Sequence, residues 1–194
     1  MKTKYQDTRQ HLLDTGRIIL AEQGFSSVGL SALLQQAGVP KGSFYHYFKS
    51  KEHYGQVLLE DYFSTYMQDM EALLGQSQIS AKQRLLNYFA QWLQRFTPAQ
   101  GRCDCLVVKL SAEVADLSEA MRLTLKEGTE QAMGRLMACI EEAINEGSLP
   151  EQDVRALASN LYQLWLGASL LTKLSRDDEQ VKQAMQLTCK LLGA

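Results

Sequence analysis

Residues 39–52 of this chain read Val39-Pro40-Lys41-Gly42-Ser43-Phe44-Tyr45-His46-Tyr47-Phe48-Lys49-Ser50-Lys51-Glu52. Small, polar, basic and aromatic residues alternate here, and the pattern predicts one short helix over residues 41–48. Pro40 suits the start of that helix, because an N–H group would have no helical partner there. The mixture favours insertion into the major groove of DNA, where hydroxyl groups can face base edges and lysines can face phosphates.

The residues before this stretch predict two more helices. A first helix is expected from a cap at Asp7 or Thr8 to about residue 23, and Gly24 is suited to end it. A short second helix is expected over residues 30–37, followed by a turn at Gly38. Two short helices joined by a tight turn that contains glycine are typical of a helix-turn-helix unit.

The rest of the chain also has helical periodicity. Ser50 is expected to cap a long fourth helix ending near residue 74. Further helices are predicted over residues 81–96, 103–114, 118–146, 153–174 and 177–192. A strand over residues 105–110 is the alternative for that segment, and we favour helix. The predicted fold is therefore all-α, with a three-helix helix-turn-helix DNA-binding head over residues 1–50 and a helical-bundle body over residues 51–194.

Charge is distributed unevenly along the chain. The 194 residues carry a net charge of −2, but residues 1–55 contain seven Lys and Arg against four Asp and Glu, which leaves +3 in the head and −5 in the remainder. A basic head on an acidic body directs the head toward phosphates. The modest +3 also argues against nonspecific DNA packaging. No apolar run is long enough to span a membrane, and residues 1–8 lack the apolar core of a signal peptide, so a soluble cytoplasmic protein is expected.

The first residues of the third helix are the candidates for reading bases. In a helix-turn-helix unit the second helix lies in the major groove with its N-terminal residues at base edges. Here these residues are Lys41, Gly42 and Ser43. Gly42 would let the backbone approach DNA, while Lys41 and Ser43 would bind bases or phosphates.

The aromatic residues of the same helix divide into two groups. Phe44 and Phe48 are expected in the core, because their spacing matches the leucines of the second helix. Three amphipathic aromatics in a row cannot all be buried, so Tyr45, His46 and Tyr47 are predicted to contact the groove or phosphates. Lys51, at the start of the fourth helix, is predicted to hold a phosphate with that helix N-terminus.

The four cysteines do not form a recognisable metal motif. No Cys-x-x-Cys pair is present, and no histidine is near any of them in the sequence. No metal or other cofactor is therefore expected. An enzyme that uses Cys105 as its nucleophile is disfavoured as well, because the body contains no histidine to act as the base. Cys139 and Cys189 lie on apolar helical faces and are read as small core residues.

Residues 37–52, with Gly24-Phe25 and Leu33-Leu34 upstream, closely resemble the signature of the TetR family of bacterial repressors. The resemblance implies a three-helix DNA-binding head, an all-helical regulatory body, a homodimer formed through the last two helices, and a palindromic double-stranded operator released by a small inducer. It also implies that Ser31 on the second helix contacts DNA, together with Lys41, Ser43, Tyr45 and His46 on the third.

The body resembles a subgroup of TetR-family repressors that respond to reactive electrophiles and chlorine oxidants. The resemblance lies in residues 105–114, 116–119 and 164–168. It implies sensing through one cysteine and a nearby lysine, which correspond to Cys105 and Lys173. Ala115 departs from the pattern, because the relatives carry a second cysteine there.

Cys103 is a second departure, and its thiol could capture an oxidised Cys105. The chemistry fits the implied pair, since a neighbouring ammonium group stabilises a thiolate. From the residues alone, a lysine near a helix C-terminus is also explained by the helix dipole. The expected function is a repressor released from its operator when a small electrophile or oxidant modifies Cys105. A TetR-type repressor with a reversible, noncovalent ligand is the alternative.

Overall fold

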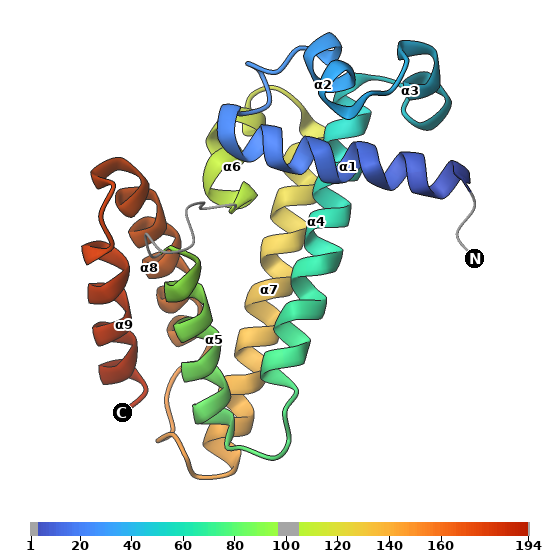
Figure 1. The fold of residues 1–194 in the computed structure, drawn as a ribbon. Coiled ribbons are helices and arrows are strands. Elements are labelled where there is room, and N and C mark those ends of the chain that lie inside the picture. The colour runs from blue at the N-terminus through green and yellow to red at the C-terminus, as the bar shows by residue number, and fades with distance from the viewer. Residues whose placement is uncertain (1–3, 97–104, 194) are drawn as a thin grey trace. The chain divides into compact units, whose positions relative to one another are not determined.

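The computed structural model describes residues 4–96 and 105–193, with the backbone alone for residues 4–6. Within these ranges the chain forms nine helices and no strand (Figure 1), so the all-α prediction is confirmed. The helices are α1 (Lys4–Gln23), α2 (Leu30–Ala37), α3 (Lys41–Tyr47), α4 (Lys51–Leu74), α5 (Ala81–Arg95), α6 (Leu106–Ala115), α7 (Glu119–Asn145), α8 (Val154–Ser175) and α9 (Glu179–Leu191). No helix of the described residues is long and apolar enough to cross a membrane.

Most predicted boundaries agree with these helices to within two residues, and three differences change how a residue is interpreted. Helix α1 begins at Lys4, so Asp7 lies inside its first turn and is not the cap. Helix α3 ends at Tyr47, and Phe48 follows in extended backbone. Helix α6 begins at Leu106, because Cys105 already has extended backbone and forms the N-cap.

The chain divides into two compact units. The first contains residues 1–65 and 104–128, and the second contains residues 66–103 and 129–194. Helices α4 and α7 each begin in the first unit and continue into the second. The division into a head of residues 1–50 and a body of residues 51–194 remains a prediction about function.

Aromatic side chains of α3, of the residue that follows it and of α4 form part of the core of the first unit. Phe44, Phe48 and Tyr54 are almost completely buried and pack against one another. The Tyr54 hydroxyl donates a hydrogen bond of 2.7 Å to the carbonyl of Leu12 in α1. Burial raises the pKa of Tyr54 far above its usual range, so this hydroxyl keeps its proton. A side chain at Gly16 would collide with that hydroxyl, which explains a glycine on the buried face of α1.

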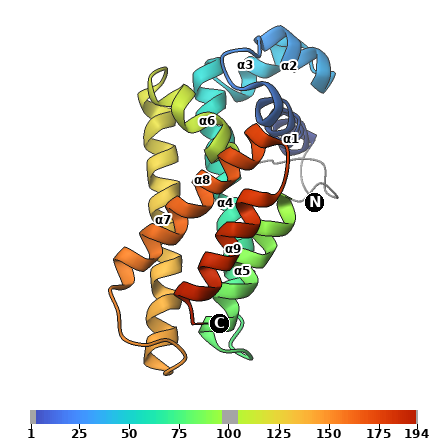
Figure 2. The same ribbon diagram turned by 90° about the vertical axis from the view of Figure 1, so that its left-hand side faces the viewer.

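The second unit is built on the antiparallel pair α8 and α9, with α5 packed against α9 (Figure 2). Trp165 of α8 is fully buried and stacks on Phe89 of α5, with ring centroids 5.3 Å apart. The Trp165 indole N–H donates to Thr188 Oγ1 of α9 at 2.9 Å. Tyr162 is buried against Trp92 in the same cluster. Trp165 and Tyr162 therefore lie in the core of their own chain.

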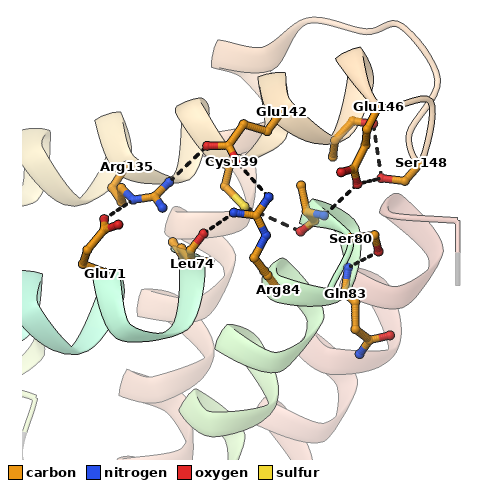
Figure 3. Close-up of polar contacts among 12 residues, drawn as sticks. Glu71, Leu74, Ser80, Gln83, Arg84, Arg135, Cys139, Glu142, Glu146 and Ser148 are labelled. Atoms are coloured by element: carbon orange, nitrogen blue, oxygen red, sulfur yellow. Dashed lines mark hydrogen bonds and ion pairs between the residues drawn. The ribbon is translucent and has the colours of Figure 1, made fainter. Parts of the chain in front are cut away.

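A buried arginine connects the ends of α4, α5 and α7 (Figure 3). Arg84 donates to the carbonyl of Leu74 at the end of α4 and to Glu142 Oε2 of α7 at 2.7 Å. At the start of α5, Glu146 accepts a hydrogen bond from the N–H of Ala81 at 2.6 Å. Carbonyl and N–H groups at helix ends lack helical partners, and these side chains satisfy them.

Candidate nucleic-acid interface and sensor site

A glycine turn sets the angle between α2 and α3, which lie together at one end of the first unit (Figure 1). Gly38 has φ 64° and ψ 26°, the left-handed conformation that glycine adopts without steric cost. The N–H of Val39 donates to the carbonyl of Leu34 at 3.0 Å, and the N–H of Gly38 donates to Gln35 at 3.2 Å. These bonds close the C-terminus of α2 and direct the chain into α3.

Helix α3 has one buried face and one exposed face. Phe44 is buried within α3 and Phe48 directly after it, so their predicted place in the core is confirmed. The predicted DNA-contacting residues lie on the other side: Lys41, Gly42, Tyr45 and His46 are exposed, and Ser43 and Tyr47 are half-buried. Ser31 of α2 is also exposed. This placement leaves the predicted reading residues accessible to DNA, and their contacts with bases and phosphates remain predictions.

Gly42 is not required by packing inside this chain. A Cβ atom at Gly42 would meet nothing within 4 Å, and the residue has no positive φ. Glycine in a helix costs about 0.5–1 kcal/mol relative to alanine. A glycine that is costly and serves no internal contact fits a close approach by a partner, as the sequence predicted.

Replacing Gly42 with alanine should separate stability from operator binding. We expect the free energy of unfolding to stay level or rise by up to ~1 kcal/mol, because alanine is the better helix former. Operator affinity should fall about tenfold, the usual effect of losing ~1.4 kcal/mol at an interface. Urea denaturation and fluorescence anisotropy with an operator duplex measure the two quantities. Unchanged affinity would place DNA away from Gly42.

The side chain of Lys51 is engaged inside the protein. Its ammonium group donates to the carbonyl of Phe25 at 2.7 Å and lies 4.4 Å from the centre of the Phe25 ring. Desolvation lowers the pKa of Lys51, and the charges of Glu52 and Glu113 oppose this shift. The phosphate contact was predicted because the sequence alone places Lys51 at the start of the fourth helix. The bond to the Phe25 carbonyl involves residues 26 positions apart, which the sequence does not reveal.

Cys105 lies at the N-cap of α6 and is half-buried. Its sulfur is 4.0 Å from the hydroxyl of Tyr62, the outer limit for a hydrogen bond to sulfur. The Arg17 guanidinium of α1 lies over the Tyr62 ring at 5.2 Å from its centre. A helix N-terminus favours an anionic sulfur, as does a nearby hydroxyl donor. Sequence reasoning did not single out Tyr62 or Arg17, because only the fold brings α1, α4 and α6 together.

Lys173 lies in the last turn of α8, in the second unit. Its ammonium nitrogen is buried and has no hydrogen-bond partner among the described residues. An unsatisfied buried polar group is costly, so this nitrogen requires a partner. Cys105 belongs to the first unit, and its pairing with Lys173 stays a prediction. Cys103 lies outside the described residues.

The remaining cysteines have different surroundings. Cys139 is fully buried and its thiol lies 3.5 Å from the carbonyl of Ala81, so its predicted role as a core residue is confirmed. Burial raises the pKa of Cys139 to about 11, which keeps the thiol protonated and unreactive. Cys189 is only half-buried, so the core prediction was too strong for this residue. Among the described residues, no group of His, Cys, Asp and Glu side chains could hold a metal ion.

Comparison with known proteins identifies the family. The N-terminal model of bacterial regulatory proteins of the tetR family matches residues 12–53, and a tetracycline repressor-like C-terminal domain model matches residues 81–188. The chain belongs to the TetR family. It is therefore a DNA-binding transcriptional repressor and not an enzyme.

Individual relatives cover nearly the whole TetR-family chain. The HTH-type transcriptional repressor NemR of Escherichia coli strain K12 is 41% identical over 184 residues, which cover 92% of this chain and 90% of NemR. The repressor DhaR of Mycobacterium sp. strain GP1 is 33% identical, over 95% of this chain and 91% of DhaR. The crystal structure of reduced E. coli NemR matches with a TM-score of 0.91, over 95% of this chain and 96% of that one.

Regulators of the TetR family bind operator DNA and act as dimers, and α8 and α9 carry an exposed apolar face. Gly167, Leu170, Leu171 and Leu174 of α8 recur at helical spacing and are all exposed, Leu174 by 72%. Leu187 and Leu191 of α9 are exposed by 43% and 39%. Clustered exposed leucines on a monomer mark a surface that another protein covers.

Proposed function

We propose that this TetR-family repressor binds an inverted-repeat operator as a homodimer and is released when a small electrophile or chlorine oxidant modifies Cys105. The observation that carries the proposal is the position of Cys105. Cys105 is half-buried at the N-terminus of α6, its sulfur lies beside Tyr62, whose ring is covered by Arg17, and α6 packs against α1 of the DNA-reading part. A bulky adduct on this sulfur would have to displace neighbours that belong to the same unit as α2 and α3.

The chemistry requires only the thiol and its reaction partner. With an α,β-unsaturated carbonyl compound, the thiolate forms an S–C bond at the β-carbon and a proton is added at the α-carbon. With hypochlorous acid, the thiolate takes chlorine and hydroxide leaves. The amino group of Lys173, once it has given up a proton to solvent, or the thiol of Cys103 can then displace chloride, which forms an S–N or S–S bond and releases a proton.

The proposed homodimer uses the exposed leucines of α8 and α9. A two-fold axis would place the same leucines of each protomer against one another, as in other isologous interfaces. Gly167 would allow close approach of the two α8 helices, since no atom lies within 4 Å of a Cβ at that position. Two heads held by such a dimer would read half-sites in successive major grooves of cytoplasmic DNA.

Replacing Cys105 with serine tests the trigger. Operator affinity of the untreated protein should stay within about twofold, because serine is isosteric. In this variant, release by N-ethylmaleimide or by hypochlorite should be lost. In the parent protein, each reagent should lower operator affinity at least tenfold, the scale of typical allosteric coupling of 1–3 kcal/mol. Normal release of the serine variant would refute the trigger.

Replacing Lys173 with methionine should remove the hypochlorite response and leave the N-ethylmaleimide response.

A reversible ligand is the second candidate inducer. Thr172 Oγ1 and Lys173 Nζ are buried and have no hydrogen-bond partner among the described residues, which favours a polar ligand near the end of α8. Induction that reverses on dialysis without a reductant would support this candidate and exclude a covalent adduct as its cause.

A further inference from the structure

The turn between α1 and α2 is held by one carboxylate from α6. After α1 the chain turns at Gly24, which has φ 87°, and the next two N–H groups point toward Glu113. The N–H of Phe25 donates to Glu113 Oε2 at 2.9 Å, and the N–H of Ser26 donates to Oε1 at 2.5 Å. A carboxylate that accepts two backbone N–H groups makes charge-assisted bonds, about twice as strong as neutral ones.

Lys51 holds the same residue of the turn from the other side. Its ammonium donates to the carbonyl of Phe25, a residue that is only 4% exposed. Phe25 is therefore bound through its N–H by an acidic residue of α6 and through its carbonyl by a basic residue of α4. Lys51 is the first residue of α4, four positions after the end of α3. The contact thus joins α6, the α1–α2 turn and the segment that follows the reading helix.

Charge and packing both favour this arrangement. Desolvation acts to raise the pKa of Glu113, but the hydrogen bonds from Ser26 and Phe25 outweigh it and the pKa is lowered. The carboxylate is therefore ionised at neutral pH. A Cβ atom at position 24 would lie 2.8 Å from Glu113 Oε2, so glycine gives the carboxylate room.

Helix α6 links this contact to the proposed sensor. Cys105 is its N-cap and Glu113 lies in its last turn, eight residues on. At 1.5 Å per residue these positions are about 12 Å apart along one short helix. A shift of the first turn of α6 is therefore carried to Glu113, because the helix moves as a rigid element.

We propose that Glu113 is a positioning residue for operator reading: its carboxylate fixes the α1–α2 turn, and with it α2 and α3, to helix α6. Operator affinity then depends on where α6 lies. The first part of this inference concerns the reduced protein alone. Its second part, in which modification of Cys105 moves α6 and loosens the turn, rests on the proposed function.

The test uses the full chain with Glu113→Gln and, as a matched control, Glu127→Gln. Glutamine is nearly isosteric, but its amide turns an N–H donor toward a backbone donor. Glu127 is an exposed glutamate of the same unit. The reduced Glu113→Gln protein should bind an operator duplex at least tenfold more weakly than the parent, with an unchanged far-UV circular dichroism spectrum. The control should bind within twofold. Parental affinity of Glu113→Gln would overturn the positioning role.

Amide hydrogen exchange gives a readout that does not depend on any variant folding. In the parent protein, treatment with N-ethylmaleimide should make the amides of Phe25 and Ser26 exchange at least tenfold faster, because their acceptor has moved. Unchanged exchange at both amides in a protein that has left the operator would overturn the coupling role of Glu113.

Lys51→Met should weaken operator binding, as Glu113→Gln should. Unchanged binding would remove Lys51 from the contact.

The failures of the two proposals differ. If the alkylated parent binds operator as well as the reduced parent, the sensing function fails, and Glu113 is judged by the reduced proteins alone. If alkylation instead lowers the operator affinity of the parent and of Glu113→Gln by the same factor, the sensing function stands and the coupling through Glu113 fails. If the parent is released but alkylation changes the operator affinity of Glu113→Gln by less than threefold, both the sensing function and the coupling through Glu113 are supported.

Discussion

Replacing Trp165 with alanine is expected to lower the free energy of unfolding by about 3–5 kcal/mol, the range for large aromatic residues removed from a core. Trp165 is fully buried between Phe89 and Trp92, with ring centroids 5.3 and 5.6 Å away. The substitution removes these contacts and leaves Thr188 Oγ1 without its indole donor. Urea denaturation followed by circular dichroism measures the loss, at one fixed protomer concentration because dimerisation contributes to stability.

Trp165→Phe is the matched control for this prediction. It keeps an aromatic ring against Phe89 and loses the indole N–H, so a smaller loss of about 1–3 kcal/mol is expected. Thr188 still donates to the carbonyl of Ala184 at 2.8 Å in either variant. A loss below ~1 kcal/mol for Trp165→Ala would mean that this cluster is not the core of the second unit.

The double substitution Leu171→Asp and Leu174→Asp should abolish the dimer. Both leucines are exposed, by 49% and 72%, on one face of α8. In an isologous interface the new carboxylates of the two protomers would lie close together in an apolar setting, where unpaired charges are strongly unfavourable. We expect dimer affinity to fall at least 100-fold, which corresponds to about 2.7 kcal/mol. Sedimentation velocity measures it directly.

Operator binding should fall with the dimer, because a monomer can occupy only one half-site. Leu123→Asp is the control, since Leu123 is 39% exposed on α7 in the first unit and lies outside the proposed interface. The control should remain dimeric and bind operator normally. A dimer that survives the double substitution would place the interface elsewhere.

The sequence predicted the helices well because their signals are local. Ser50 caps α4 as expected and accepts from the N–H of His53, and Ser118 caps α7 by accepting from the N–H of Met121. Phe44 and Phe48 could be assigned to the core from their spacing alone. The start of α1 was predicted too late, because Asp7 suits a helix's first turn as well as its cap.

The candidate site was only partly predictable, because its contacts are long-range. Reading residues on α3 follow from one continuous motif. The bonds that Glu113 accepts from the N–H groups of Phe25 and Ser26 join residues 88 and 87 positions apart, and no local pattern reveals them. The same holds for Tyr62 beside Cys105, which lies 43 positions away. The packing of Trp165 on Phe89, 76 positions away, is equally long-range.

The most direct test of the account compares operator release with the fraction of Cys105 modified. An inverted-repeat duplex that the protein binds is first selected from a randomised pool. The protein bound to this duplex is then treated with increasing concentrations of N-ethylmaleimide. Intact and peptide mass spectrometry measure the adduct at each cysteine, and anisotropy measures release from the duplex. Release should follow the Cys105 adduct, with Cys139 unmodified. Full modification of Cys105 while the protein stays on the operator would contradict it.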